Sequence, residues 1–288
     1  MNHVRIYEVG PRDGLQNEKA VIATEKKIAL IDLLSVAGFD HIEATSFVSP
    51  KWVPQLADAE AVLAGIIRRP GVTYAALTPN LKGFERALAA KAGEVAIFGA
   101  ASETFSLKNI NCSVAGSLER FAPVAEAARR AGIPVRGYVS CAVACPYEGA
   151  IAPEAVRDVA AKLIDMGCYE VSLGDTIGQA TPETVTAMLE GVLQSVPVQQ
   201  LAGHYHDTNN RALDNIRASL ALGLRTFDSA VGGLGGCPYA PGAKGNVSTT
   251  ALATMLAAEG WETGIDMERL AAAEAYLASE IAMVPAGE

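Results

Sequence analysis

The chain has 288 residues, half of them hydrophobic, and a formal net charge of −9 from 23 basic and 32 acidic side chains. This balance argues against a nucleic-acid binder, which needs a concentrated basic face. The N-terminus lacks an apolar signal stretch, and no apolar run approaches the ~18 residues that cross a bilayer. We therefore expect a cytoplasmic protein that binds neither nucleic acid nor membrane.

Eight short apolar runs rich in β-branched residues predict strands. They cover residues 5–9, 41–47, 73–77, 94–98, 134–140, 170–173, 200–206 and 226–231. Stretches with helical periodicity lie between them, at residues 24–37, 55–67, 81–90, 117–131, 153–166, 181–193, 211–222 and 248–256. Several begin at a capping residue such as Thr24 or Thr181, and several end near a glycine such as Gly132 or Gly167.

This alternation predicts an α/β fold. Eight similar strand–helix units favour a closed (β/α)₈ TIM barrel over about residues 4–258, with a doubly wound open sheet as the alternative. No linker divides the units, so we expect a single catalytic domain over residues 1–288. A further helical pattern at residues 267–281 predicts a C-terminal extension over about 266–283 that covers a face or forms a contact.

The polar residues that carry chemistry fall where predicted strands end. They are Arg12-Asp13, Glu43, Asp175, the pair His204 and His206, and the glycine-rich segment 232–246. In a TIM barrel the C-terminal ends of the strands hold the active site. Side chains far apart in sequence are therefore expected to meet at one mouth.

His204 and His206 lie two residues apart on a predicted strand, so both side chains point to the same face. Imidazoles at this spacing can bind one metal, and Asp13 and Asn246 are plausible oxygen ligands. This mixed nitrogen and oxygen set suits Mg²⁺ or Mn²⁺ better than Zn²⁺. The alternative is a pair of hydrogen-bonding histidines without a metal.

Arg12 beside Asp13 has two interpretations. The pair forms an ordinary surface ion pair, or Arg12 stabilises a developing enolate while Asp13 turns toward the metal. A guanidinium keeps its charge and presents a fork of donors, so lysine would replace it poorly.

Cys237 lies in the segment GGLGGCPY at residues 232–239, where little side-chain bulk prevents close approach to a ligand. A thiol near a cation can act as acid or base, although an incidental loop cysteine fits the spacing too. The chain has five cysteines and no metal-finger spacing. Cys141 and Cys145 suggest either a redox pair or, as we prefer, buried reduced residues.

Glu43 and Asp175 are carboxylates within or ending apolar strands, where an unpaired charge is costly. They can orient Arg12, receive a proton or hold a water; a structural ion pair is the alternative for Glu43. Lys19, Lys51 and Lys108 follow strand ends or loops and can meet phosphates or simply face solvent.

The sequence resembles the 3-hydroxy-3-methylglutaryl-CoA lyases, which belong to a superfamily of metal-dependent barrels similar to pyruvate carboxyltransferases. The matching segments are residues 8–18, 43–50, 172–178, 204–208 and 232–246, and they span nearly the whole barrel. The cysteine-containing segment is the most specific, since related synthases share the Arg-Asp and His-x-His elements but carry a different final loop.

The resemblance implies cleavage of 3-hydroxy-3-methylglutaryl-CoA to acetyl-CoA and acetoacetate by a retro-Claisen step, as in leucine degradation. It also implies a role for each matched residue: Asp13, His204, His206 and Asn246 as metal ligands; Arg12 on the enolate; Cys237 in proton transfer; Glu43 and Asp175 as acidic residues needed for catalytic activity; Gln16 and Lys19, with Arg12, on the acyl-CoA substrate.

Three alternatives remain open. Asn209 and Asn210 stand where these lyases often have Tyr-Gly, which allows a related 3-hydroxyacyl-CoA lyase. An aldolase or Claisen synthase acting on 2-oxo acids would not require Cys237. A catalytically silent barrel is disfavoured because every proposed ligand position keeps a competent side chain. Tyr205, between the two histidines, is expected to face away from the metal, and the apolar helices favour a homodimer.

Overall fold

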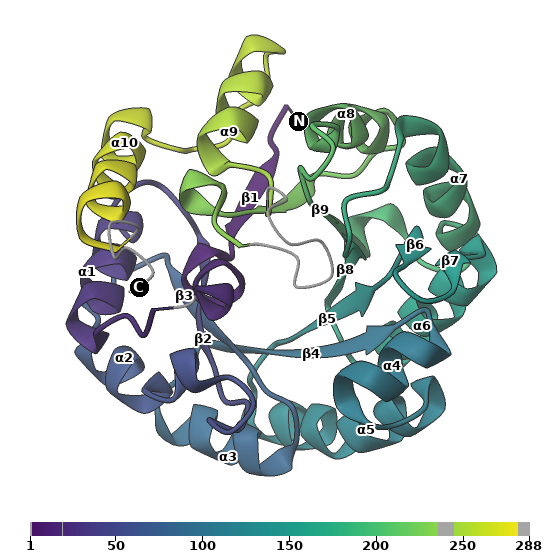
Figure 1. The fold of residues 1–288 in the computed structure, drawn as a ribbon, viewed down its shortest axis with the longest axis horizontal. Coiled ribbons are helices and arrows are strands. Elements are labelled where there is room, and N and C mark those ends of the chain that lie inside the picture. The colour runs from purple at the N-terminus through teal and green to yellow at the C-terminus, as the bar shows by residue number, and fades with distance from the viewer. Residues whose placement is uncertain (1, 19, 236–244, 282–288) are drawn as a thin grey trace.

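Eight parallel strands close into a barrel in this computed structural model, which describes residues 2–18, 20–235 and 245–281 (Figure 1). The order around the barrel is β1-β10-β9-β8-β5-β4-β3-β2. The strands are β1 (Arg5–Glu8), β2 (His41–Ser46), β3 (Thr73–Leu77), β4 (Glu94–Ala100), β5 (Val135–Ser140), β8 (Glu170–Asp175), β9 (Leu201–Tyr205) and β10 (Thr226–Ser229). The predicted TIM barrel is confirmed, and the open sheet is excluded.

A ring of helices surrounds the strands, and each predicted helix is present (Figure 1). They are α1 (Thr24–Leu34), α2 (Ala59–Gly65), α3 (Leu81–Ala89), α5 (Val114–Ala131), α6 (Pro153–Met166), α7 (Pro182–Val192), α8 (Ala212–Ala221) and α9 (Thr249–Ala258). Gly132 and Gly167 end α5 and α6 with positive φ angles of 68° and 111°, a conformation that glycine adopts without strain. Both helices therefore end at the glycines that the sequence predicts.

Three local features differ from the prediction. α2 is shorter than residues 55–67 because Pro54–Leu56 forms a separate 3₁₀ turn before it. The eight-residue helix α4 (Glu103–Ile110) and the hairpin of β6 (Ala144–Cys145) and β7 (Gly149–Ala150) were not predicted. Elements this short carry too few apolar residues to establish a period.

The C-terminal segment forms α10 (Met267–Tyr276) and a π-helical turn over Leu277–Ile281. It packs beside α1 and α9 on the outside of the barrel (Figure 1). Its Glu274 accepts hydrogen bonds from Thr250 Oγ1 at 2.7 Å and from the Gly232 backbone at 3.3 Å. The extension therefore contacts the base of the glycine-rich segment.

The helices of the described residues are all too short or too polar to pass through a lipid bilayer. The four described cysteines, Cys112, Cys141, Cys145 and Cys168, are free thiols, and the last three are buried. The burial expected for Cys141 and Cys145 is thus confirmed.

Polar side chains fill much of the barrel interior, while the apolar core lies mainly between strands and helices. Arg136 on β5 is 0% exposed and forms ion pairs with Glu170 at 2.9 Å and Asp228 at 2.7 Å. Its guanidinium also lies 4.0 Å from the centre of the Tyr7 ring. Such burial is tolerated because each charge has a partner.

Glu8 at the end of β1 joins three segments that lie far apart in sequence. One carboxylate oxygen accepts backbone hydrogen bonds from Gly10 at 2.8 Å and Val231 at 2.9 Å. The other accepts one from Thr249 Oγ1 at 2.8 Å. Burial raises the pKa of Glu8 to about 7, although these hydrogen bonds oppose the shift.

Glu8 should therefore make the stability of the protein depend on pH. Because its folded pKa exceeds its unfolded value of 4.5, its contribution is complete below pH 4.5 and is lost as the pH rises through 7. The change amounts to roughly 3 kcal/mol of unfolding free energy. Denaturant unfolding of wild type and Glu8→Gln between pH 5 and 8 measures it. A stability difference that stays constant across this range would contradict the assignment.

Candidate metal centre

A tight turn after β1 presents Arg12 and Asp13 at the barrel mouth. Residues Gly10–Gly14 form a single π-helical turn, and the Val9 carbonyl accepts backbone hydrogen bonds from residues 12, 13 and 14. A Cβ atom at Gly10 would lie 2.6 Å from a carboxylate oxygen of Glu8, so a larger residue cannot occupy this position without a shift. The turn is thereby held against the end of its own strand.

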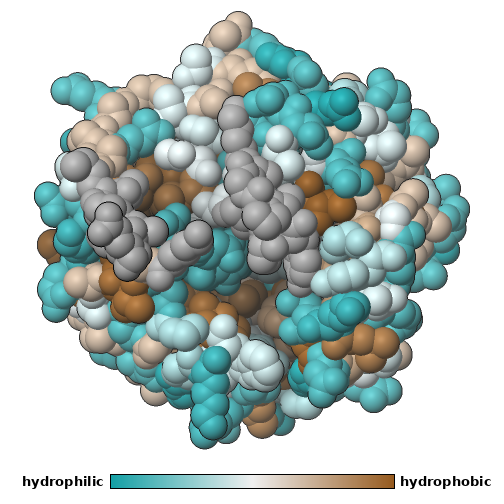
Figure 2. Space-filling view, viewed as in Figure 1, coloured by the Kyte–Doolittle hydropathy of each residue, from teal (hydrophilic) through white to brown (hydrophobic). Residues whose placement is uncertain are grey.

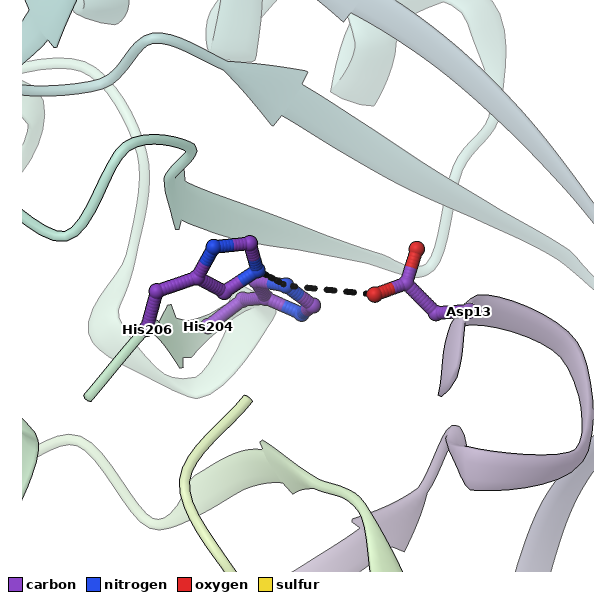
Figure 3. Close-up of side chains that lie close together, drawn as sticks. All are labelled: Asp13, His204 and His206. Atoms are coloured by element: carbon purple, nitrogen blue, oxygen red, sulfur yellow. Dashed lines mark hydrogen bonds and ion pairs between the residues drawn. The ribbon is translucent and has the colours of Figure 1, made fainter. Parts of the chain in front are cut away.

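The two histidines extend from β9 into the same mouth, facing Asp13 (Figure 3). His204 lies within the strand and His206 directly follows it, so strand alternation puts both on the inner face. Tyr205 between them points outward, and its hydroxyl lies 2.7 Å from Ser219 Oγ on α8. The expectation that Tyr205 faces away is confirmed.

The ligand atoms of Asp13, His204 and His206 lie within 4.8 Å of one another. The two Nε2 atoms are 3.3 Å apart, and His204 Nε2 lies 4.0 Å from Asp13 Oδ2. Nδ1 of His204 lies 3.0 Å from Asp228 Oδ2, which favours a proton on Nδ1 and a lone pair on Nε2. Two imidazole nitrogens thus approach an aspartate oxygen.

Asn246 lies at this cluster because its backbone forms an isolated antiparallel β-bridge with that of His206. Its amide nitrogen donates hydrogen bonds to Asp13 Oδ2 at 2.9 Å and to the Leu234 carbonyl at 3.1 Å. The amide oxygen remains as the ligating atom of this side chain. Gly235 permits the close approach: its φ is +102°, and a Cβ there would lie 2.8 Å from the Asn246 amide nitrogen.

The spacing of these atoms suits a small divalent cation. Ligands about 2.1 Å from an octahedral ion lie roughly 3.0 Å apart when adjacent and roughly 4.2 Å apart when opposite. The observed 3.3 and 4.0 Å separations fall between these values. Nδ1 of His206 is buried without a hydrogen-bond partner among the described residues, so this ring meets the cluster through its Nε2.

The protonation states also suit a cation. Burial would raise the pKa of Asp13, but Arg12 and the two histidines lower it to about 2. Burial and the neighbouring His204 lower the pKa of His206 to about 4. Burial lowers the pKa of His204 as well, but Asp228 and Asp13 outweigh this and raise it above its ordinary value. A cation at this cluster would therefore compete with a proton for His204 more than for His206.

Arg12 lies beside the cluster and is held from two sides. Its Nε and one terminal nitrogen lie 2.6 Å from Glu43 Oε2, and the other terminal nitrogen lies 2.6 Å from Asp13 Oδ1. Glu43 Oε2 also accepts a hydrogen bond from the Tyr138 hydroxyl at 3.1 Å. Glu43 is thus placed to orient Arg12, one of the roles expected from the sequence.

The remaining predicted residues are placed differently. Gln16 donates to Asp13 Oδ1 at 3.0 Å and so borders the cluster. The carboxylate oxygens of Asp175 accept backbone hydrogen bonds from Gln179 and Ala180, both at 3.0 Å, and burial raises its pKa to about 6. Its catalytic role remains a prediction. Lys19 and Cys237 lie outside the described residues.

Sequence reasoning missed three residues that support the site: Asp228, Arg136 and Tyr138. Asp228 contacts His204, Tyr138 contacts Glu43, and Arg136 contacts both of these supporting residues. Each lies inside a predicted strand. A charged residue within an apolar strand is the available signal for Asp228 and Arg136, as it is for Glu43 and Asp175. Tyr138 carries no such signal.

The fold and these side chains define a class of protein: a TIM barrel with an Asp-His-His cluster that could hold a cation, and an adjacent guanidinium, at the C-terminal ends of its strands. Residues 3–277 match the HMGL-like family. The chain belongs to this family.

Several proteins share most of its length. The mitochondrial hydroxymethylglutaryl-CoA lyase of Bos taurus is 59% identical over 95% of this chain and 84% of that protein. A 3-hydroxy-3-isohexenylglutaryl-CoA/hydroxymethylglutaryl-CoA lyase of Pseudomonas aeruginosa is 58% identical over 93% of this chain and 89% of that protein. The crystal structure of the HMG-CoA lyase from Brucella melitensis is 59% identical, covers 97% of this chain and 99% of its own, and superposes with a TM-score of 0.96.

Removing one imidazole should weaken cation binding. We expect His206→Ala to raise the Kd for Mn²⁺ at least tenfold, because one nitrogen ligand is lost from the cluster. Mn²⁺ titration of the metal-free protein by calorimetry measures it. His41→Ala is the matched control, since His41 contacts Asp40 and Glu94 at the other end of the barrel. An unchanged Mn²⁺ affinity in His206→Ala would contradict the ligand assignment.

Proposed function

We infer that this protein is a carbon–carbon lyase that cleaves 3-hydroxy-3-methylglutaryl-CoA to acetyl-CoA and acetoacetate. The observation that carries this inference is the cation cluster with Arg12 held directly beside it, in a chain of the HMGL-like family. A retro-Claisen cleavage needs these two elements together. The hydroxyl must lose its proton, and the departing thioester must be stabilised as an enolate.

The proposed cofactor is Mg²⁺ or Mn²⁺, held by Asp13, His204, His206 and the Asn246 amide oxygen. Oxygen and imidazole ligands without thiolate suit these ions. Such an ion, when bound, polarises the oxygens of a hydroxy acid and lowers the pKa of its hydroxyl group.

Arg12 is proposed to stabilise the enolate. When the C3 hydroxyl loses its proton and becomes a ketone, the C2–C3 bond breaks and its electron pair moves toward the thioester oxygen. A guanidinium carries five N–H donors, and Glu43 and Asp13 account for three of them. The remaining two have no hydrogen-bond partner among residues 2–18, 20–235 and 245–281, and we propose that they bind that oxygen, in a buried position where a charge interaction is strong.

A proton must then reach C2 of the enolate to give acetyl-CoA. We propose Cys237 for proton transfer, since the glycine-rich segment that carries it begins at the cluster: Leu234 contacts Asn246. Glu43 is a second candidate, because burial raises its pKa despite the nearby Arg12. Asp175 has a raised pKa as well, but its oxygens are already engaged by backbone amides.

The acyl-CoA substrate is expected to contact Arg12, Gln16 and Lys19. Gln16 lies at the cluster through its bond to Asp13, which supports contact with the acyl end. A homodimer and cytoplasmic residence remain predictions made from the sequence.

The activity has a direct test. Protein treated with EDTA should release almost no acetoacetate from 3-hydroxy-3-methylglutaryl-CoA, and added Mg²⁺ or Mn²⁺ should restore the reaction. A coupled assay for acetoacetate measures both states. Pyruvate or another 2-oxo acid with acetyl-CoA is the comparison, since a Claisen synthase would consume that pair. Metal-restored turnover of the 2-oxo acid alone would overturn the lyase assignment.

The same assay should also include 3-hydroxy-3-isohexenylglutaryl-CoA, because the name of one relative contains this thioester. The Pseudomonas aeruginosa protein is called a 3-hydroxy-3-isohexenylglutaryl-CoA/hydroxymethylglutaryl-CoA lyase. A 3-hydroxyglutaryl thioester with a longer C3 branch is therefore the alternative substrate, with the same bond broken. The ratio of kcat/KM for the two thioesters decides between them.

Arg12→Lys should lower kcat by roughly 10²–10³ because a lysine ammonium lacks the guanidinium fork and cannot span Glu43, Asp13 and the enolate oxygen together. Steady-state kinetics at saturating Mn²⁺ measure it. Arg129→Lys is the control, since Arg129 forms a comparable pair with Glu126 on the exposed surface of α5. Near-normal turnover in Arg12→Lys would remove the guanidinium from the mechanism.

A further inference from the structure

The guanidinium of Arg136 has a bonded partner on every nitrogen, inside the barrel and beneath the candidate site. Nε donates to Glu170 at 2.9 Å, and the two terminal nitrogens donate to Tyr138 at 3.0 Å and Asp228 at 2.7 Å. The side chain is completely buried. Burying an arginine is costly, and apolar residues of similar volume often serve stability as well or better. Its presence therefore suggests a role besides stability.

One branch from Arg136 leads to the cation cluster. Asp228 Oδ1 accepts a hydrogen bond from Arg136. Asp228 Oδ2 accepts one from Ser172 Oγ at 2.7 Å and lies 3.0 Å from His204 Nδ1. Burial opposes ionisation of Asp228, but Arg136 and His204 lower its pKa strongly. The carboxylate is thus fixed on both oxygens, and it fixes the ring plane of His204.

The other branch leads to Arg12. The Tyr138 hydroxyl accepts from Arg136 and donates to Glu43 Oε2 at 3.1 Å, and the same carboxylate oxygen binds Arg12 at 2.6 Å. The Tyr138 ring also lies beneath Arg12, 5.4 Å from its guanidinium carbon. One buried cation is therefore connected to both halves of the proposed site.

We propose that Asp228 and Arg136 are positioning residues for the reaction. Asp228 holds His204 with Nε2 directed at the cation, and Arg136 holds Asp228 while it aligns Glu43 through Tyr138. Together they set the separation between the cation ligands and Arg12. This inference rests on the proposed metal centre and adds residues that touch neither the cation nor the substrate.

The test is Mn²⁺ titration of metal-free protein, with kinetics at saturating Mn²⁺ as a second readout. Asp228→Asn keeps the shape of the side chain but replaces one carboxylate oxygen with an NH₂ group. An amide has a single oxygen, which cannot accept from Arg136 and from His204 Nδ1 in the positions of the two carboxylate oxygens. This variant should raise the Kd for Mn²⁺ about 10- to 100-fold. Arg136→Lys should raise it in the same direction and also lower kcat at saturating Mn²⁺. Ser172→Ala removes a single hydrogen bond and should raise the Kd about two- to tenfold.

Asp58→Asn is the control for breaking the ion pair of a buried residue away from the candidate site. It breaks the Lys27–Asp58 pair of 2.9 Å, where Lys27 is 3% exposed and belongs to α1 outside the barrel. This variant should lose stability in thermal melts while its Mn²⁺ affinity stays at the wild-type value.

The outcomes separate the two proposals. Wild type that binds no Mn²⁺ and works without it would overturn the metal centre itself. Wild-type binding with an unchanged Kd in folded Asp228→Asn and Arg136→Lys would overturn the positioning role alone. If those two variants do not fold, Ser172→Ala decides: an unchanged Kd there overturns the proposal, and a weakened Kd supports it.

Discussion

The pairing of β1 with β10 is the constraint on which the candidate site depends. Its register sets Glu8 opposite Ser229 and thereby closes the barrel. Without closure, Asp13 after β1 and His204 on β9 would lie at different places along an open sheet. Closure also brings Val231 and Thr249 to the Glu8 carboxylate, so the join is secured by hydrogen bonds as well as by the strand ladder.

The barrel interior contains charged side chains that are buried from solvent and paired with one another. Each desolvated ion has a partner of opposite charge or backbone donors, because an unpaired buried charge costs far more than a paired one. Arg136 with Asp228 and Arg12 with Glu43 follow this rule. The resulting network is stiff, since moving one member leaves another unsatisfied.

Asp13 illustrates the same organisation at the mouth itself. Arg12 and Gln16 bind one of its oxygens, and Asn246 binds the other. The carboxylate is therefore oriented before any cation binds, and little ordering remains to oppose binding. Although burial opposes them, Arg12, the two histidines and Asn246 hold the pKa of Asp13 at about 2, so this carboxylate is an anion at neutral pH.

The sequence by itself predicted the barrel, because alternating strand and helix periods are local properties, and eight similar repeats favour closure over an open sheet. It also indicated Asp13, His204, His206 and Asn246 as a ligand set, since His-x-His at a strand end places both rings on one face. Only the tertiary structure decided that Asp228 supports His204, that Glu43 holds Arg12, and that backbone amides engage Asp175. Those contacts join different strands, and no period along one chain specifies which buried charge meets which.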